Sequence, residues 1–207
     1  MPPVSQARMK LLEAMLEAMW ERSYAAISVD AICERAGVRK GSFYHFFPSK
    51  CALAVAALEH KWQTEASTCL DEMFGSGLPP LERLSRVVDH WYEKARASQL
   101  EHGRVLGCPY FSIACETAGV EPELAAMARK ILDGFQDRLE RTLAEARDRG
   151  DLVLDDPAAT AACLFSLLEG ASTQARIHDD PERVRHLAPA IGGLLGIDFP
   201  PVTPATA

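Results

Sequence analysis

The residues of this chain whose types and spacing could do chemistry gather between positions 28 and 53. Cationic and hydroxyl side chains alternate there with aromatic ones and a glycine. Such donors bind phosphate oxygens of a nucleic acid and read base edges in the major groove. The candidate DNA-binding residues are Ser28, Arg39, Lys40, Gly41, Ser42, Tyr44, His45 and Lys50.

The pattern around these residues predicts two short helices joined by a tight turn, with a third helix following at once. Ala31, Ile32 and Ala36 recur at helical spacing, and Gly37 ends that run. Glycine adopts the positive φ of such a turn at little cost. We therefore expect a helix-turn-helix, whose second helix enters the DNA major groove.

Within this motif the candidate donors are expected to contact different parts of the DNA. Ser28 and the amides behind it present a helix N-terminus to a phosphate. The residues that reach toward bases are Arg39, Lys40, Ser42 and His45. Phe43 and Phe46 are expected in the core, holding the second helix against Leu11 and Met15. The competing interpretation is that the aromatic residues are only core and the charges only a solvated face.

The same stretch resembles the TetR/AcrR family of one-component transcriptional regulators. The resemblance covers roughly residues 5–65 and lies in Ala31-Ile32, Ala36-Gly37-Val38, Gly41-Ser42-Phe43-Tyr44-His45-Phe46, Pro48-Ser49-Lys50 and Leu53. It implies that Tyr44 and Lys50 contact phosphates. Two positions depart from the family pattern: Arg39 replaces a small hydroxyl residue, and Cys51 stands where an acidic residue is common. Arg39 bears on the operator sequence, because it can add a base or phosphate contact.

The charge distribution agrees with a small nucleic-acid-binding head on an acidic body. The net charge is −7, but residues 1–62 hold 8 Lys and Arg against 6 Asp and Glu, a net of +2. The remaining residues hold 14 against 23, a net of −9. Such asymmetry between segments is typical of a DNA-binding head.

Helical periodicity along the whole chain predicts an all-α fold of about nine helices. Three form the head, and a fourth is expected to start at Pro48–Ser49 and run to about Phe74. The expected helices of the body are Leu81–Gln99, Val105–Thr117, Pro122–Arg149, Pro157–His178 and Glu182–Leu195. The expected domains are residues 1–50 for DNA binding, 51–198 for effector binding and dimerisation, and 199–207 as a flexible tail.

The body carries the candidate effector site. The family resemblance implies a pocket for a small apolar molecule, which aromatic side chains suit. The candidate ligand-binding residues are Trp91, Tyr92, Cys108, Tyr110, Phe111, Phe135 and Phe165. Cys108 lies near the N-terminus of the expected helix Val105–Thr117, where the dipole favours a thiolate, so it is also a candidate sensor of oxidants or electrophiles. The alternative is that Cys108 is a small buried hydrophobe.

The last two helices are the candidates for assembly. The resemblance implies that they pair with their two-fold mates as a four-helix bundle. The candidate interface residues are Leu164, Leu168, Ala171, Leu187, Ile191 and Leu195. Each of them could equally belong to the core of one chain.

The conclusion from the sequence is a homodimeric, ligand-responsive transcription factor rather than an enzyme. It would bind double-stranded DNA at a palindromic operator and most simply act as a repressor, released by a small apolar effector. A second hypothesis is a thiol-based regulator that uses Cys108, and a third is a Cys108-dependent hydrolase. No cofactor or metal is expected, because the six cysteines form no CxxC pair. No membrane span or secretory signal is expected either, so a reducing cytoplasm is the predicted location.

Overall fold

The computed structural model describes residues 6–75 and 77–202, and in these residues the chain is all-α, without a β-strand. The helices of the first half are α1 (Gln6–Glu21), the 3₁₀ turn η1 (Tyr24–Ala26), α2 (Val29–Ala36), α3 (Lys40–Phe46), α4 (Lys50–Phe74) and α5 (Pro80–His102). Those of the second half are α6 (Pro109–Thr117), α7 (Pro122–Asp148), α8 (Pro157–His178), α9 (Glu182–Arg185) and α10 (Leu187–Leu195). No helix of the described residues has the length and apolar character that crossing a bilayer requires.

The chain folds into two compact units. The first unit combines the residues up to Ser67 with Pro109–Leu132, and the second combines Thr68–Cys108 with the residues from Asp133 onward. The long helices α4 and α7 contribute to both. These units are defined by compactness, whereas the expected boundary after residue 50 separated a DNA-binding segment from an effector-binding segment. That functional boundary stays a prediction.

In the first unit, α1 packs on α2 and α3, and α6 lies against η1 and α1. The side chains that fill this core include Leu11, Leu12, Met15, Ile32, Phe43, Leu53 and Ile113, each 2% exposed or less. Phe43 therefore holds α3 in the core together with Leu11 and Met15, as the sequence predicted, whereas Phe46 is half-buried.

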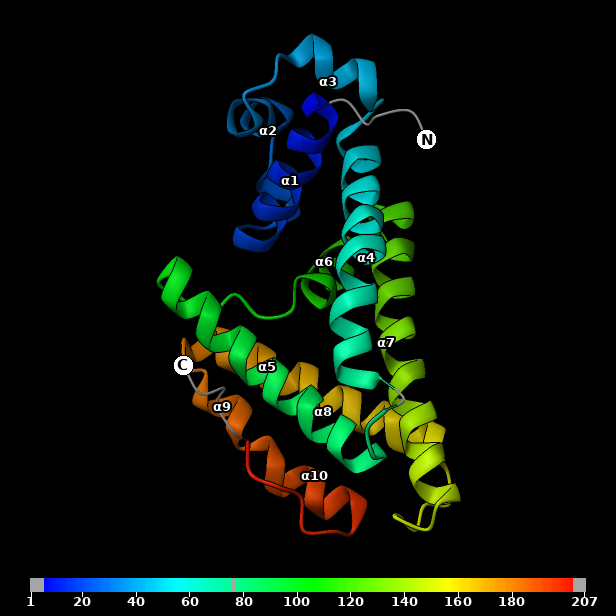
Figure 1. Ribbon diagram of the computed structural model, residues 1–207. Coiled ribbons are helices and arrows are strands. Elements are labelled where there is room, and N and C mark those ends of the chain that lie inside the picture. The colour runs from blue at the N-terminus through cyan, green and yellow to red at the C-terminus, as the bar shows by residue number, and fades with distance from the viewer. Residues whose placement is uncertain (1–5, 76, 203–207) are drawn as a thin grey trace. The chain divides into compact units, whose positions relative to one another are not determined.

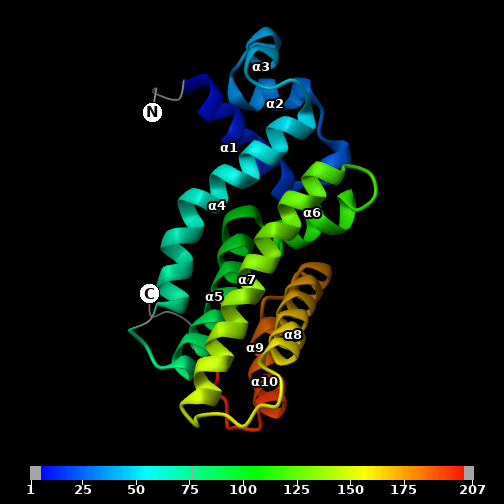
Figure 2. The same cartoon turned by 90° about the vertical axis from the view of Figure 1, so that its right-hand side faces the viewer.

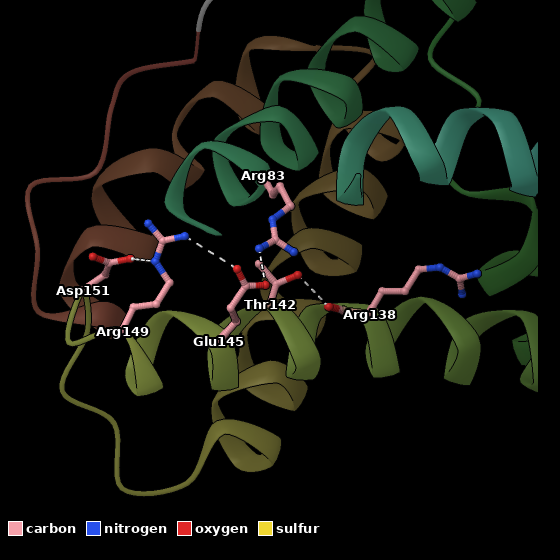
Figure 3. A network of polar contacts seen from close by, with 6 residues as sticks. All are labelled: Arg83, Arg138, Thr142, Glu145, Arg149 and Asp151. Carbon is pink, nitrogen blue, oxygen red and sulfur yellow. Dashed lines mark hydrogen bonds and ion pairs between the residues drawn. The ribbon is translucent and has the colours of Figure 1, made fainter. Parts of the chain in front are cut away.

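In the second unit, α5 and α8 run side by side, and the short α9 packs on both (Figures 1 and 2). A polar network joins α5 to α7 (Figure 3). The buried Arg83 of α5 donates to Glu145 of α7, which lowers the pKa of that carboxyl. Arg149 Nη1 lies 3.7 Å from Glu145 Oε1, and Arg149 Nε lies 3.1 Å from Asp151 Oδ2. Arg83 and Arg149 therefore share the Glu145 carboxylate. Since a buried guanidinium needs a counter-ion, this network fixes α7 beside α5.

The expected helix over 182–195 is divided into α9 and α10 at His186. Pro189 explains the break, because its ring clashes with the carbonyl of Arg185 and its nitrogen cannot donate to it. Residues 6–75 and 77–202 therefore form ten α-helices where about nine were expected.

The expected helix from Val105 begins only at Pro109. The backbone N–H groups of Val105 and Leu106 are bound elsewhere, to Asp179 Oδ1 at 2.7 Å and to Ser98 Oγ at 3.2 Å. These bonds tie residues 105–106 to α8 and α5 outside any helix, and Pro109 disfavours a helical conformation of the residue before it.

Part of the expected tail is packed rather than free. Phe199 and Val202 are buried, and the chain passes so close to α10 that a Cβ on Gly192 would lie 2.8 Å from the carbonyl oxygen of Ile197. Residues 203–207 of the expected tail lie outside the described residues.

Candidate nucleic-acid interface and effector site

The turn between α2 and α3 has the chemistry that the sequence predicted. Ser28 caps α2 by accepting from the Ala31 amide at 3.1 Å. Gly37 ends α2 with φ of +62°, a left-handed conformation that glycine adopts without a Cβ clash. The Val38 amide then donates to the carbonyl of Cys33 at 2.9 Å, which closes the turn. These local bonds set the angle at which α3 leaves α2.

In helix α3 the ring of Phe43 packs in the core, and the side chain of the next residue, Tyr44, is exposed. Phe43 is fully buried, and its ring meets that of Tyr44 edge to face with centroids 5.0 Å apart. Tyr44 is 53% exposed, so its hydroxyl end is free to meet a partner. A Cβ on Gly41 would meet nothing within 4 Å, so packing inside the protein does not demand a glycine there. The thin first turn of α3 instead suits close approach of another molecule.

The structure brings most of the predicted DNA-binding residues onto one exposed end of the first unit. Exposed side chains or backbone are found at Ser28, Arg39, Lys40, Gly41, Tyr44 and His45, and Ser42 is half-buried. Lys40 forms an ion pair with Asp30, Nζ to Oδ1 at 2.8 Å. Arg39, in contrast, has no ion-pair partner among the described residues, which leaves its full charge for a ligand.

Lys50 has an intramolecular role that the sequence did not predict. Its ammonium donates to the carbonyls of Tyr24 and Ile27, both at 2.9 Å, and lies 4.0 Å from the centroid of the Tyr24 ring. An ammonium has three donors, so one remains for a phosphate. The phosphate contact of Lys50 stays a prediction, while its hold on residues 24–27 is visible.

The second unit contains an aromatic cluster at the predicted effector site. The Phe135 ring contacts three other rings, with centroids 4.8 Å from Trp91 and 5.5 Å from Phe165 in tilted arrangements and 5.3 Å from Phe74 edge to face. Phe74 was missed by the sequence analysis, although its place at the end of α4 was a usable signal. His90 lies beside Trp91, and burial, with the nearby Lys94, lowers its pKa to about 4. The imidazole is therefore neutral near neutral pH.

Three other predicted ligand-binding residues are placed differently. The buried Tyr92 donates its hydroxyl to Glu182 at 2.6 Å and lies between Arg96 and Arg185, so it joins α5 to α9. Tyr110 and Phe111 lie on α6 in the first unit, half-buried. Their contact with an effector stays a prediction.

Cys108 lies directly before α6 rather than inside the expected helix from Val105, although it is near the helix N-terminus as predicted, and its neighbour was not foreseen. The Glu169 carboxyl of α8 is 2% exposed and no described N–H or O–H group donates to either of its oxygens. Burial raises the pKa of Glu169 to about 7, and the thiol of Cys108, a weak donor beside the carboxyl, opposes that shift. An acidic residue within the apolar run of α8 was the sequence signal for this pair. Cys108 is half-buried, whereas Cys115 is exposed and is not a core thiol.

Five of the six predicted interface residues belong to the core of the second unit. Leu164, Leu168, Leu187, Ile191 and Leu195 are all buried within the chain, and Ala171 is half-buried. Five of these side chains therefore pack inside one chain, the alternative that the sequence left open. The exposed face of α8 carries small residues instead: Ala159, Cys163, Ser166 and Gly170.

Comparison with known proteins agrees with this geometry. A family model for bacterial regulatory proteins of the tetR family matches residues 11–57, and one for tetracyclin repressor-like C-terminal domains matches residues 80–191. The transcriptional regulator AcuR of Cereibacter sphaeroides is 32% identical over 193 residues, which cover 92% of this chain and 86% of AcuR. The transcriptional repressor NemR of Escherichia coli K12 is 27% identical over 158 residues, 76% of this chain and 77% of NemR.

Solved structures share the fold. The crystal structure of the regulatory protein TetR from Rhodobacter sphaeroides superposes with a TM-score of 0.80 at 30% identity, over 92% of this chain and all of that one. The reduced form of Escherichia coli NemR superposes with a TM-score of 0.77 at 24% identity, over 92% of this chain and 98% of NemR. Both halves of the sequence and the fold thus lead to one conclusion: the chain belongs to the TetR family of transcriptional regulators.

Proposed function

We propose that this regulator is a homodimeric repressor that binds a palindromic operator and is released by a small apolar effector. The observation that carries the proposal is α3, which is anchored by the buried Phe43 and exposes Arg39, Lys40, Tyr44 and His45 together. One short helix reads only a few base pairs. Two copies related by a two-fold axis read half-sites about 34 Å apart or a multiple of that distance. The chromosome lies in the cytoplasm, where the protein would act.

The effector would bind at the cluster of Phe74, Trp91, Phe135 and Phe165, because aromatic walls suit an apolar ligand. It can release DNA only if it binds the two states of the dimer unequally. A coupling of about 1–3 kcal/mol changes DNA affinity by roughly 5- to 150-fold.

The experiment that tests DNA binding is selection from a random pool of duplexes with the purified full-length chain, followed by footprinting. The expected result is a palindrome with two protected half-sites. Arg39→Gln should lower affinity and, if Arg39 contacts a phosphate, reduce the salt slope by about 1. Failure to select any sequence at low ionic strength would contradict the proposal.

A thiol switch at Cys108 is the second candidate function, favoured by a half-buried thiol that lies directly before the N-terminus of α6. Hydrogen peroxide would oxidise the thiol to a sulfenic acid and be reduced to water. The test is release of the selected DNA by hydrogen peroxide in the wild type and in Cys108→Ser. Release that persists in the variant rules out this thiol as the sensor.

A further inference from the structure

The short turn η1 is held at both ends by charged side chains from other helices of the first unit. At its start, Glu116 of α6 accepts three hydrogen bonds, from the Ser23 hydroxyl and from the amides of Tyr24 and Ala25, both amides at 2.8 Å. At its end, the Lys50 ammonium of α4 binds the carbonyls of Tyr24 and Ile27. A carboxylate at the start of a helical turn and a cation at its end both match the backbone dipole.

The Glu116 carboxylate is ionised in this setting. Burial alone would raise its pKa, but the hydrogen bonds from Ser23, Ala25 and Tyr24, with the nearby charge of Lys50, outweigh burial and lower the pKa. Bonds from backbone amides to a carboxylate are among the stronger hydrogen bonds in proteins. Glu116 therefore binds α6 firmly to η1 and its preceding residue Ser23.

The Tyr24 side chain adds a second attachment to the same turn. Tyr24 is 4% exposed, its ring lies under the Lys50 ammonium, and its hydroxyl donates to Glu121 at 3.3 Å. Burial, with the Glu121 carboxylate, raises the pKa of Tyr24, so the hydroxyl keeps its proton. Together these contacts tie two residues of η1, Tyr24 and Ala25, and the flanking Ser23 and Ile27 to α4, α6 and the segment that follows α6.

The position of η1 determines where the helix-turn-helix begins. The buried Ile27 joins η1 to Ser28, the cap of α2, and its amide donates back to the Tyr24 carbonyl at 3.2 Å. Only the Gly37 turn separates α2 from α3. At its other end, α6 starts at Pro109, the residue after Cys108, where the chain leaves the second unit. The contacts of Glu116 and Lys50 with η1 thus connect the start of the helix-turn-helix to α4 and α6 within the first unit.

We propose that Glu116 is a positioning residue for DNA binding: it holds the helix-turn-helix to α6 through η1, so that the two heads of a dimer meet both half-sites at once. The inference rests on the proposed function. A head whose η1 is released still reads its own half-site, because α2 and α3 keep their own core and cap. It loses the pre-organisation that makes the second half-site an intramolecular binding event.

The test compares wild type, Glu116→Ala and Glu116→Gln on two duplexes, the palindrome selected by the wild type and a duplex with one half-site of it. Glu123→Gln is the matched control, because Glu123 is exposed at the start of α7 in the same unit and has no bond to η1. We expect Glu116→Ala to bind the palindrome on the order of 10-fold more weakly and the half-site within about twofold of wild type. The affinity of Glu116→Gln for the palindrome should lie between those of Glu116→Ala and wild type, since its amide oxygen still accepts a hydrogen bond but carries no charge.

Hydrogen exchange supplies a second readout in the same variants. In Glu116→Ala the amides of Tyr24 and Ala25 should exchange faster, while those of α5 and α8 keep their protection. Equal palindrome affinity in Glu116→Ala and wild type would overturn the inference. An equal loss of affinity for both duplexes would also overturn it, because that result is expected when the helix-turn-helix itself is misfolded. If the wild type binds neither duplex, the proposed function itself fails and the inference fails with it.

Discussion

Tyr44 is the exposed side chain of α3 whose hydroxyl can be removed with least disturbance, because its ring already packs on Phe43. Tyr44→Phe should weaken binding to all DNA sequences alike, by roughly 10- to 150-fold, the value of one hydrogen bond to a charged acceptor. Binding isotherms on the selected palindrome and on unrelated duplexes measure this. Tyr92→Phe, which removes a hydroxyl bound to Glu182, is the control that should bind DNA as wild type does. A loss confined to one sequence would assign Tyr44 to base contact.

Glu169 makes the stability of the protein depend on pH. Its carboxyl pKa rises from 4.5 to about 7 on folding because of burial. At low pH the Glu169 carboxyl is protonated in both the folded and the unfolded protein. As pH rises, it ionises first in the unfolded chain, which stabilises the unfolded state. Above the folded-state pKa the folded protein carries the full free-energy cost of a buried charge. The free energy of unfolding should therefore fall by on the order of 3 kcal/mol between about pH 4 and pH 8 from this residue.

Glu169→Gln removes that titration. Denaturant unfolding at several pH values should show the variant gaining stability over wild type as pH rises from 4 to 8. Glu93→Gln on α5 carries the same change at a residue that is only half-buried, and should follow the wild-type curve. Parallel curves for wild type and Glu169→Gln would show that the carboxyl is not held in a low-dielectric site.

At the scale of elements, the two glycines of the helix-turn-helix have opposite roles. Gly37 has φ of +62°, whereas Gly41 lies inside α3, and a Cβ at either would meet nothing within 4 Å. Gly37→Ala should cost about 1 kcal/mol of stability through backbone strain alone. Gly41→Ala should leave stability unchanged or raise it by up to about 1 kcal/mol, because alanine favours helix.

The same pair separates folding from DNA binding. Gly41→Ala should lower affinity for the selected palindrome although the fold is no weaker, since the added methyl stands at the first turn of α3. Thermal unfolding and binding isotherms on both variants measure the two effects. Unchanged affinity in Gly41→Ala would show that α3 does not approach DNA closely at this point.

At the scale of the whole molecule, the exposed face of α8 is where we expect the two copies to meet. Gly170 lies on that face, and a side chain there meets nothing within the chain. Gly170→Glu should therefore keep the fold of each protomer while placing like charges across the two-fold axis. We expect a monomer by analytical ultracentrifugation and loss of the palindrome complex.

Val153→Glu is the matched control, because Val153 is 95% exposed in the loop between α7 and α8 and gains the same charge. It should remain dimeric and bind DNA as wild type does. A dimer that survives Gly170→Glu would move the interface to another surface.

The sequence by itself determined the local features. The positions of Ser28, Gly37 and Pro157 fixed where α2 begins, where it ends and where α8 begins, because caps, positive φ and proline act within one or two turns. The burial of Phe43 was predicted from the sequence, and the exposure of Tyr44 agrees with the phosphate contact that the family resemblance implies.

Only the tertiary structure decided the partners of long side chains and the faces of apolar helices. Lys50 reaches back to residues 24–27, Glu116 binds amides more than 90 positions away, and Cys108 lies beside Glu169. Periodicity identifies an apolar stripe such as that of Leu164 and Leu168 but not whether its own chain or a second copy covers it. These choices depend on contacts between distant segments, which exist only after the helices have packed.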